Sequence, residues 1–197
     1  MLHTDCADSL LPYLPQCFKC GSTSQDYATC RPCRSVVRPE AVYATTHLKG
    51  VGRDLVQNYK FGQALAAKEP LARQMSAVLP GYMPGFVVVP VPTVASHVRT
   101  RGFDHSTRLA RALAEEHGLP FADLLSRSGK AKQVGSSRKQ RLAQLKGAFS
   151  VQPNAILPDK VLLVDDVATT GATLSECTKV LRRAGVKHVQ AVVFAKS

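Results

Sequence analysis

The sequence predicts an α/β domain with a largely parallel sheet, preceded by a small cysteine-rich appendage. Apolar segments of strand length alternate with amphipathic segments of helix length, which is the order of a parallel sheet flanked by helices. The segment FVVVPV, residues 86–91, is apolar throughout, as in a strand buried on both faces. Four of the six cysteines fall within residues 17–33, ahead of the first predicted strand. We therefore predict two units, an appendage over 1–38 and a domain over 39–197.

The first half of the domain contains two predicted strands and two predicted helices. Strands are expected over 41–45 and 86–91, and a helix over 51–59. A second helix is expected over 70–79, because apolar residues recur on one of its sides and Pro70 suits a first turn.

The second half continues this alternation. We expect a helix over 104–117, closed by Gly118, and a buried strand over 160–164. A helix over 173–184 and a closing strand over 189–194 follow. Such an order of elements completes a parallel sheet.

The charge of the chain points to an anionic partner. The 197 residues include 26 Lys and Arg against 14 Asp and Glu, a formal net charge of +12. A solvated, soluble surface is the simpler explanation, but residues 126–149 contain basic residues and no acid. A predicted loop of this charge attracts nucleic acid or a small ligand with several phosphates. Its basic residues are Arg127, Lys130, Lys132, Arg138, Lys139, Arg141 and Lys146.

Neither a membrane span nor a signal peptide is predicted. No run of about 18 apolar residues occurs. The N-terminus has no basic segment ahead of its short apolar patch. We expect a cytoplasmic protein without membrane insertion.

Two C-x-x-C pairs predict a structural zinc site. The pairs are separated by nine residues, and four thiolates can surround Zn²⁺ tetrahedrally without an open position for water. A pair of disulfides is the alternative, which cytosolic proteins rarely keep. The predicted ligands are Cys17, Cys20, Cys30 and Cys33, whereas Cys177 lies on the apolar side of its predicted helix.

The segment VLLVDDVATTGAT, residues 161–173, joins a strand to a helix through two acids and a small polar turn. Ligands of open α/β sheets bind beyond the carboxyl ends of the strands, where Asp165 and Asp166 are expected. Carboxylates accept hydrogen bonds from hydroxyl groups, and the start of the next helix suits a phosphate. We therefore predict a ribose 5-phosphate site with its diol at the two acids. The predicted phosphate ligands are Ala168, Thr169, Thr170, Gly171, Ala172 and Thr173.

Two other interpretations of this segment are an acid-tipped strand before an ordinary capped helix, and a receiver domain. Receiver domains lack the Thr/Gly turn, and a Walker phosphate loop is excluded because GxxxxGK[ST] does not occur. The thirteen residues resemble the signature of the type I phosphoribosyltransferases at every defining position. This resemblance implies that Asp165 and Asp166 hold the ribose 2′ and 3′ hydroxyls of phosphoribosyl pyrophosphate, with its 5-phosphate in the turn.

Further motifs resemble the ComF family, in order and over nearly the whole chain. They are the cysteine pairs, Tyr59-Lys60-Phe61, VVVPVP at 87–92, Arg101-Gly102-Phe103 and the acidic segment. This family groups competence proteins of naturally transformable bacteria with relatives linked to the use of DNA as a nutrient. The chain departs from the family pattern at Asp104, where asparagine is usual, and at Lys130 and Gln144.

The resemblance implies displacement at ribose C1 through an oxocarbenium-like state while pyrophosphate leaves. Positioning and charge stabilisation dominate such a reaction. Asp165 and Asp166 would be the catalytic residues, and Mg²⁺, bound mostly by ligand oxygens and water, would neutralise the leaving group. We expect Lys60, Arg99 and Arg101 to bind the pyrophosphate, with Arg127 and Arg141 closing over the site. Solvated basic side chains are the simpler alternative for the two arginines near residue 100.

Two functions remain open at this point. One is a phosphoribosyltransferase acting in DNA uptake or DNA utilisation, with an unknown acceptor. The other is a non-catalytic competence protein that binds single-stranded DNA and uses the pocket as a ligand sensor. Partners would be a ribose phosphate, single-stranded DNA and other competence proteins. Aromatic residues make up only 6% of the chain, so a stacking surface for bases is weakly supported.

Overall fold

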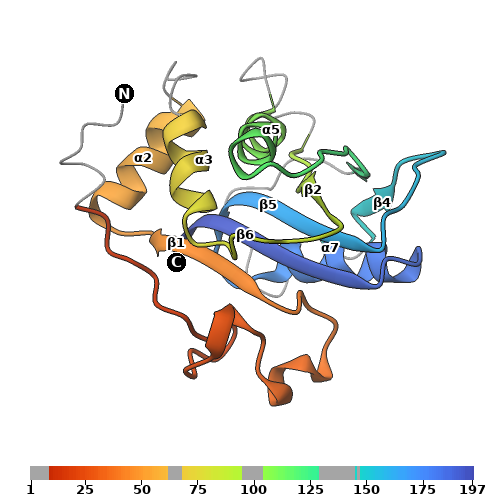
Figure 1. Ribbon diagram of the computed structural model, residues 1–197, viewed down its shortest axis with the longest axis horizontal. Helices are drawn as coiled ribbons and strands as arrows, with labels where there is room; N and C mark the ends of the chain where they lie inside the picture. The colour runs from red at the N-terminus through yellow and green to blue at the C-terminus, as the bar shows by residue number, and fades with distance from the viewer. Residues whose placement is uncertain (1–8, 62–67, 95–103, 129–144, 146) are drawn as a thin grey trace.

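The structure, a computed structural model, describes residues 9–61, 68–94, 104–128, 145 and 147–197 (Figure 1). Its centre is a four-stranded, all-parallel sheet in the order β1-β6-β5-β2. The predicted α/β class with a parallel sheet is therefore confirmed. The strands are β1 (Val42–His47), β2 (Phe86–Pro90), β5 (Lys160–Ala168) and β6 (His188–Lys196).

Helices cover both faces of this sheet. One face is covered by α2 (Gly50–Phe61), α3 (Lys68–Ser76) and α5 (His105–His117), which lie together above the strands in Figure 1. The other face is covered by α7 (Ala172–Arg183). In the part of the chain that the structure describes, none of the helices combines the length and apolar character needed to cross a membrane.

Two core clusters lie on the two faces of β5. Leu162 and Val164 pack with α2, α3 and α5, whereas Val161 and Leu163 pack with α7. All four side chains are fully buried. Burying such a side chain stabilises the fold by about 1.5–3 kcal/mol. The apolar run of β5 therefore favours burial of both faces of the strand.

β5 is longer than predicted, which corrects the expected end of the strand at residue 164. Its pairing with β6 continues to Ala168, opposite Lys196. Asp165 and Asp166 therefore belong to the strand itself. An apolar run marks the buried part of a strand, but a neighbouring strand can keep pairing beyond it, because backbone hydrogen bonds do not depend on side-chain polarity.

The predicted loop over 126–149 begins and ends in short strands. β3 (Leu125–Arg127) and β4 (Phe149–Val151) pair antiparallel. The intervening residues 129–144 and 146 lie outside the described residues.

The N-terminal segment runs along β1 and contains two short 3₁₀ helices, η1 (Gln25–Tyr27) and η2 (Arg31–Ser35) (Figure 1). Pro12 forms an antiparallel bridge with Thr46, and Ala28 forms one with Ala41. The predicted domain boundary between residues 38 and 39 remains a proposal.

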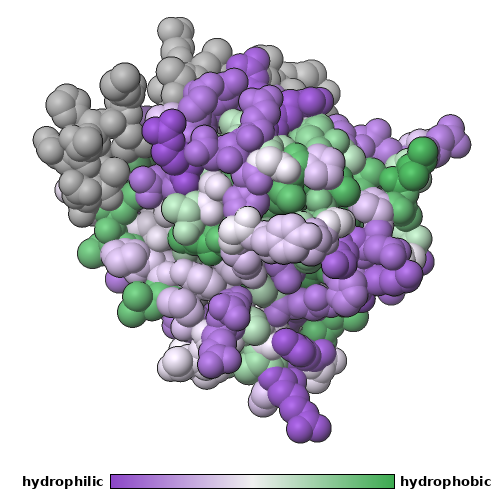
Figure 2. Space-filling model, in the orientation of Figure 1, coloured by the Kyte–Doolittle hydropathy of each residue, from purple (hydrophilic) through white to green (hydrophobic). Residues whose placement is uncertain are grey.

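Hydrophobic and hydrophilic residues are interspersed on the face displayed in Figure 2. Exposed large hydrophobic side chains are spread along the described chain, and scattered residues of this kind are normal on a soluble surface. They are Leu11, Leu14, Val36, Val37, Tyr82 and Ile156.

Candidate functional site

β5 carries Asp165 and Asp166 past the end of β2. The pairing between β2 and β5 ends at Val164, whose carbonyl accepts a hydrogen bond of 2.9 Å from the N–H of Val91. β6 continues beside β5. The two carboxyl groups therefore lie at the carboxyl end of the sheet, where open α/β sheets bind ligands.

The two aspartates face opposite sides of the sheet. Side chains alternate along a strand, so Asp165 follows the direction of Leu163, and Asp166 follows that of Val164. Leu163 belongs to the core cluster of α7, and Val164 to that of α2, α3 and α5. Each carboxyl group is therefore surrounded by different elements.

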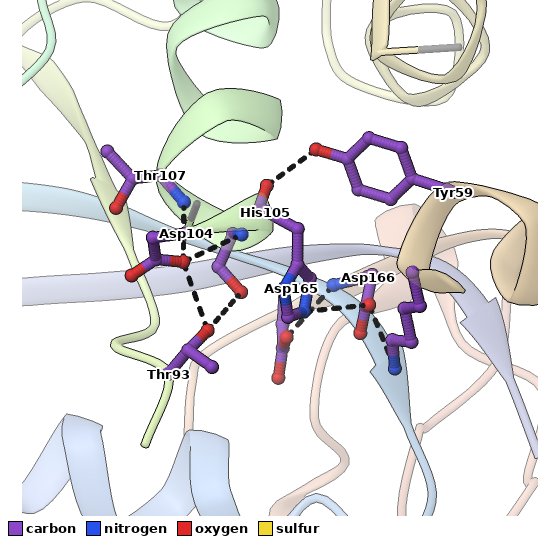
Figure 3. A network of polar contacts seen from close by, with 9 residues as sticks. Tyr59, Thr93, Asp104, His105, Thr107, Asp165 and Asp166 are labelled. Atoms are coloured by element: carbon purple, nitrogen blue, oxygen red, sulfur yellow. Dashed lines mark hydrogen bonds and ion pairs between the residues drawn. The ribbon is translucent and has the colours of Figure 1, made fainter. Parts of the chain in front are cut away.

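Asp166 is a buried, ion-paired carboxylate with an exposed fraction of only 3%. Its Oδ2 lies 2.9 Å from Lys60 Nζ and 3.3 Å from His105 Nε2 (Figure 3). Burial alone would raise the pKa of Asp166, but the close contacts with His105 and with the positive charge of Lys60 outweigh it, and the pKa is lowered. Asp166 is consequently an anion at neutral pH.

Asp165 has the opposite electrostatic character. Its Oδ1 accepts a hydrogen bond of 2.9 Å from the N–H of Asp166. Burial, with the negative charge of Asp166 as the second cause, raises the pKa of Asp165 to about 8. Asp165 therefore keeps its proton to a higher pH than Asp166 does.

The last turn of α2 brings Lys60, which we expect to bind pyrophosphate, next to Asp166. The preceding residue, Tyr59, is 1% exposed and donates a hydrogen bond of 2.6 Å to the carbonyl of His105. Burial raises the pKa of Tyr59, so the phenol stays a donor. This bond ties α2 to the first residue of α5, and both helices then reach Asp166.

Sequence reasoning did not predict a role for His105. Its side chain is buried at the first turn of α5 and reaches the same oxygen of Asp166 that Lys60 contacts (Figure 3). A local signal existed, because His105 directly follows Asp104, where the predicted helix begins. Its partner Asp166 is far away in the sequence, however, so no spacing pattern joins them.

Asp104 fixes the start of α5. Its Oδ1 accepts hydrogen bonds from the N–H of Ser106 at 3.0 Å and from that of Thr107 at 3.3 Å, which is an N-cap. The Thr93 hydroxyl donates to the same oxygen at 3.0 Å (Figure 3). Because Thr93 follows β2, this carboxylate joins the end of β2 to the helix that carries His105.

The turn after β5 leads directly into α7. Gly171 is the N-cap residue, with φ 72°, and has no side chain to cap the helix, although the Thr170 hydroxyl accepts a long hydrogen bond of 3.4 Å from the N–H of Ala172. The first N–H groups of a helix have no partner within it, and they lie at the positive end of the helix dipole. Thr169 and Thr170 are exposed beside them. An anion can bind at such a helix start.

The remaining residues of the predicted turn differ in exposure. Ala172 and Thr173 are partly exposed, whereas Ala168 is buried and its carbonyl accepts a hydrogen bond of 3.1 Å from the N–H of Ser197. Ala168 can therefore contribute backbone only.

Most of the predicted basic ligands lie outside the described residues. These are Arg99, Arg101, Arg141 and, within 126–149, every basic residue except Arg127. The guanidinium of Arg127 stacks on Phe149, with 5.0 Å from its Cζ to the ring centroid. Burial lowers the pKa of Arg127, and the nearby Cys177 and Asp165 oppose that shift. Arg127 therefore belongs to the α7 side of the sheet.

The four predicted zinc ligands come together. The sulfur atoms of Cys17, Cys20, Cys30 and Cys33 all lie within 4.8 Å of one another, and those of Cys20 and Cys30 are 3.6 Å apart. Sulfurs placed tetrahedrally around zinc at about 2.3 Å lie about 3.8 Å apart. The donor set and its spacing therefore fit the zinc ribbon expected from the sequence. Cys177, expected on the apolar side of its helix, is fully buried in the core.

Comparison with known proteins agrees with this geometry. Residues 98–197 match the family described as phosphoribosyl transferase domain. Competence protein F of Haemophilus influenzae is 30% identical over 198 residues, covering 93% of this chain and 85% of that protein. The chain belongs to the ComF family. The fold is accordingly that of a type I phosphoribosyltransferase with an N-terminal four-cysteine ribbon.

Other ComF relatives are the competence proteins ComFC of Streptococcus pneumoniae and Bacillus subtilis. The first is 30% identical, over 70% of this chain and 60% of its own, and the second is 28% identical, over 86% and 72%. Among solved structures, the allosteric regulatory enzyme of purine biosynthesis aligns with a TM-score of 0.47 and 19% identity. That match covers 70% of this chain and 30% of the enzyme's chain.

Proposed function

We propose that this ComF protein binds phosphoribosyl pyrophosphate, or a related ribose phosphate, at the end of β5. The observation that carries the proposal is the closeness in sequence of the acidic pair to the start of α7, where the N-cap residue is a glycine. Asp165 and Asp166 would bind the ribose diol, and the 5-phosphate would accept hydrogen bonds from the turn over 168–173. A ribose 5-phosphate carries both groups, a diol and a phosphate, on one molecule.

The two acids would have different tasks. Lys60 and His105 hold the carboxylate of Asp166 in place, so its charge would be positioned before the ribose binds. Preorganised charge of this kind stabilises an oxocarbenium-like state, because the site needs no reorganisation as positive charge develops on the sugar. Protonated Asp165 can donate to a hydroxyl oxygen, and ionised Asp165 can accept from one.

Transfer would follow from this binding mode. The bond between ribose C1 and the pyrophosphate oxygen breaks with its electron pair on pyrophosphate, and the acceptor forms the new bond to C1. We propose Lys60, Arg99 and Arg101 as ligands of the pyrophosphate. Lys60 would then exchange its contact with Asp166 for one shared with the leaving group.

Mg²⁺ would supply positive charge to the departing pyrophosphate. Within the acidic pair, Asp166 is ion-paired with Lys60, and the pKa of Asp165 is raised by burial and by the charge of Asp166. The residues therefore suit an ion bound mostly through ligand oxygens and water. We propose that Cys17, Cys20, Cys30 and Cys33 hold a structural zinc ion.

We propose a cytoplasmic role in DNA uptake or DNA utilisation, because the relatives are named as competence proteins. The alternative is a non-catalytic protein that binds single-stranded DNA and uses the pocket as a sensor. The net charge of +12 favours an anionic partner in both cases. Pyrophosphate release across candidate acceptors, single-stranded DNA included, distinguishes transfer from sensing.

Calorimetry tests the site itself. Phosphoribosyl pyrophosphate with Mg²⁺ should bind wild type, and the Asp165→Asn/Asp166→Asn double variant should lose at least about tenfold in affinity, since hydrogen bonds to charged groups contribute about 1.5–3 kcal/mol. Asp159→Asn is the matched control, because Asp159 precedes the opposite end of β5 and is an exposed acid paired with Lys187. Equal affinity in the double variant and the control would remove the site assignment.

A further inference from the structure

The phosphate-binding turn touches the cysteine cluster through one aromatic ring. Phe18 lies between Cys17 and Cys20, and its side chain is buried. A Cβ atom added to Gly171 would lie 2.8 Å from Phe18 Cε1 and 3.3 Å from Cδ1. The ring therefore occupies the space that any side chain at Gly171 would need.

Little space remains around this contact. The adjoining cavity holds about 10 Å³, room for about a single water molecule. On β6, the Nζ of Lys196 lies 5.1 Å from the centroid of the Phe18 ring. The residues around the cavity include Phe18, Lys19, Arg38, Gly171, Leu174 and Ser175. The ring is thus packed against the turn and the start of α7.

The position of Phe18 depends on the cysteines beside it. The N–H of Cys17 donates to the carbonyl of Ser22, and the N–H of Gly21 donates to the carbonyl of Cys17, both at 2.8 Å. These two hydrogen bonds close a tight loop. The loop is also held by the cysteine cluster, in which the four sulfur atoms lie close together. So small a unit has almost no core of its own, and a bound metal ion is what would hold it rigid.

The turn in contact with the ring is itself braced from within α7. The carbonyl of Gly171 accepts hydrogen bonds of 2.9 Å from the N–H and from the hydroxyl of Ser175. A displacement of Gly171 therefore moves the first turn of α7, whose N–H groups would contact the proposed phosphate.

We propose that Phe18 is a positioning residue for this turn, and that metal at the cysteine cluster and phosphate at the turn strengthen each other's binding. The ligand half of this proposal rests on the proposed function, whereas the contact between cluster and turn does not. Coupling between two sites is reciprocal, so each ligand raises the affinity for the other by the same factor.

Hydrogen exchange tests the contact without any phosphate ligand. Removing the metal with a chelator should speed exchange of the amides over 169–175 by about tenfold, while those of β2 stay protected. Phe18→Ala should give the same acceleration with metal bound, and chelation should then add little. In Phe18→Leu, which keeps an apolar side chain, the exchange rate of these amides should lie between those of wild type and Phe18→Ala.

Arg31→Ala is the matched control. Arg31 occupies the corresponding position of the second cysteine pair, but its side chain is exposed. In the Arg31→Ala variant, the amides over 169–175 should exchange at the wild-type rate. An unchanged turn after chelation, or an equal further acceleration on chelating Phe18→Ala, would overturn the positioning role.

Zinc affinity measured by chelator competition tests the ligand half. Saturating phosphoribosyl pyrophosphate should tighten zinc binding to wild type about tenfold and leave that of Phe18→Ala unchanged. Binding of phosphoribosyl pyrophosphate without any effect on zinc affinity would overturn the coupling. Absence of phosphoribosyl pyrophosphate binding to wild type would overturn the proposed function and the coupling to phosphate together, and hydrogen exchange would still decide the role of Phe18.

Discussion

The two faces of β5 shift the pKa values of two neighbouring aspartates in opposite directions. On the face of α2 and α5, Asp166 meets Lys60 and His105, and its pKa is lowered. On the face of α7, burial raises the pKa of Asp165 to about 8. The residues are identical and adjacent, so the difference comes from the elements that pack on each face. A motif of two acids therefore does not describe two equivalent groups.

The largest expected effect is on the Asp166 face. Lys60→Met removes the cation beside a buried carboxylate, and the free energy of unfolding should fall by about 3 kcal/mol at pH 7, as measured by urea denaturation. Lys187→Met breaks a Lys–Asp pair near the other end of β5, where both side chains are about two-thirds exposed. Its effect should stay below about 1 kcal/mol. Similar losses in both variants would show that the two pairs are equally solvated.

Asp165→Asn should have the opposite sign. The folded-state pKa of about 8 lies above the ordinary value of about 4, so the folded protein binds this proton more tightly than the unfolded chain. The free energy of unfolding consequently falls as the pH rises from about 4 to about 8. Asparagine removes this loss. We expect about 1–2 kcal/mol of stabilisation at pH 8.5, and almost none at pH 4.

Asp166→Asn is the natural comparison for that experiment. Because the pKa of Asp166 is lowered, its charge stabilises the fold above the ordinary pKa and ceases to do so as the pH falls through the folded value. This variant should lose stability at pH 8.5. Unfolding curves of both variants at several pH values check the contrast, and shifts of equal sign would contradict it.

The smallest expected effect concerns the start of α5. Asp104→Ala loses the N-cap and should cost about 1 kcal/mol of unfolding free energy, whereas Asp104→Asn should cost only a few tenths. Because α5 carries His105, the alanine variant should also shift the titration of Asp166 measured by carboxyl NMR. A shift confined to Asp165 would contradict the assignment of His105 to the other face.

The sequence predicted the elements whose signals are local. β2 and β5 were recognisable as buried strands, because unbroken apolar runs are needed only where both faces are covered. The predicted end of β5, residue 164, was wrong because the strand continues for as long as it pairs with β6. The pairing of β3 with β4 was not predicted, since strands of three residues are too short to show a period.

In the candidate site too, local features could be predicted, whereas contacts between distant residues could not. Asp165, Asp166 and the turn form one continuous segment, so their chemistry could be inferred together, as could the cysteine cluster from its spacing. The contacts of Asp166 with His105, and of Gly171 with Phe18, join residues far apart in the chain. Such contacts follow from the packing of helices and the ribbon on the sheet, which a single sequence does not specify.

The strand order has a consequence for how the chain reaches this state. β6 is the last strand along the chain, yet it lies between β1 and β5. During synthesis, β1 has no neighbour in the sheet until β6 emerges from the ribosome and inserts beside it. β6 is mainly apolar, whereas half of β1 is polar, so it is chiefly the unpaired backbone of β1 that stays open to other strands until β6 is made. We expect the folding yield of the protein to depend on growth temperature and on chaperones that shield this strand.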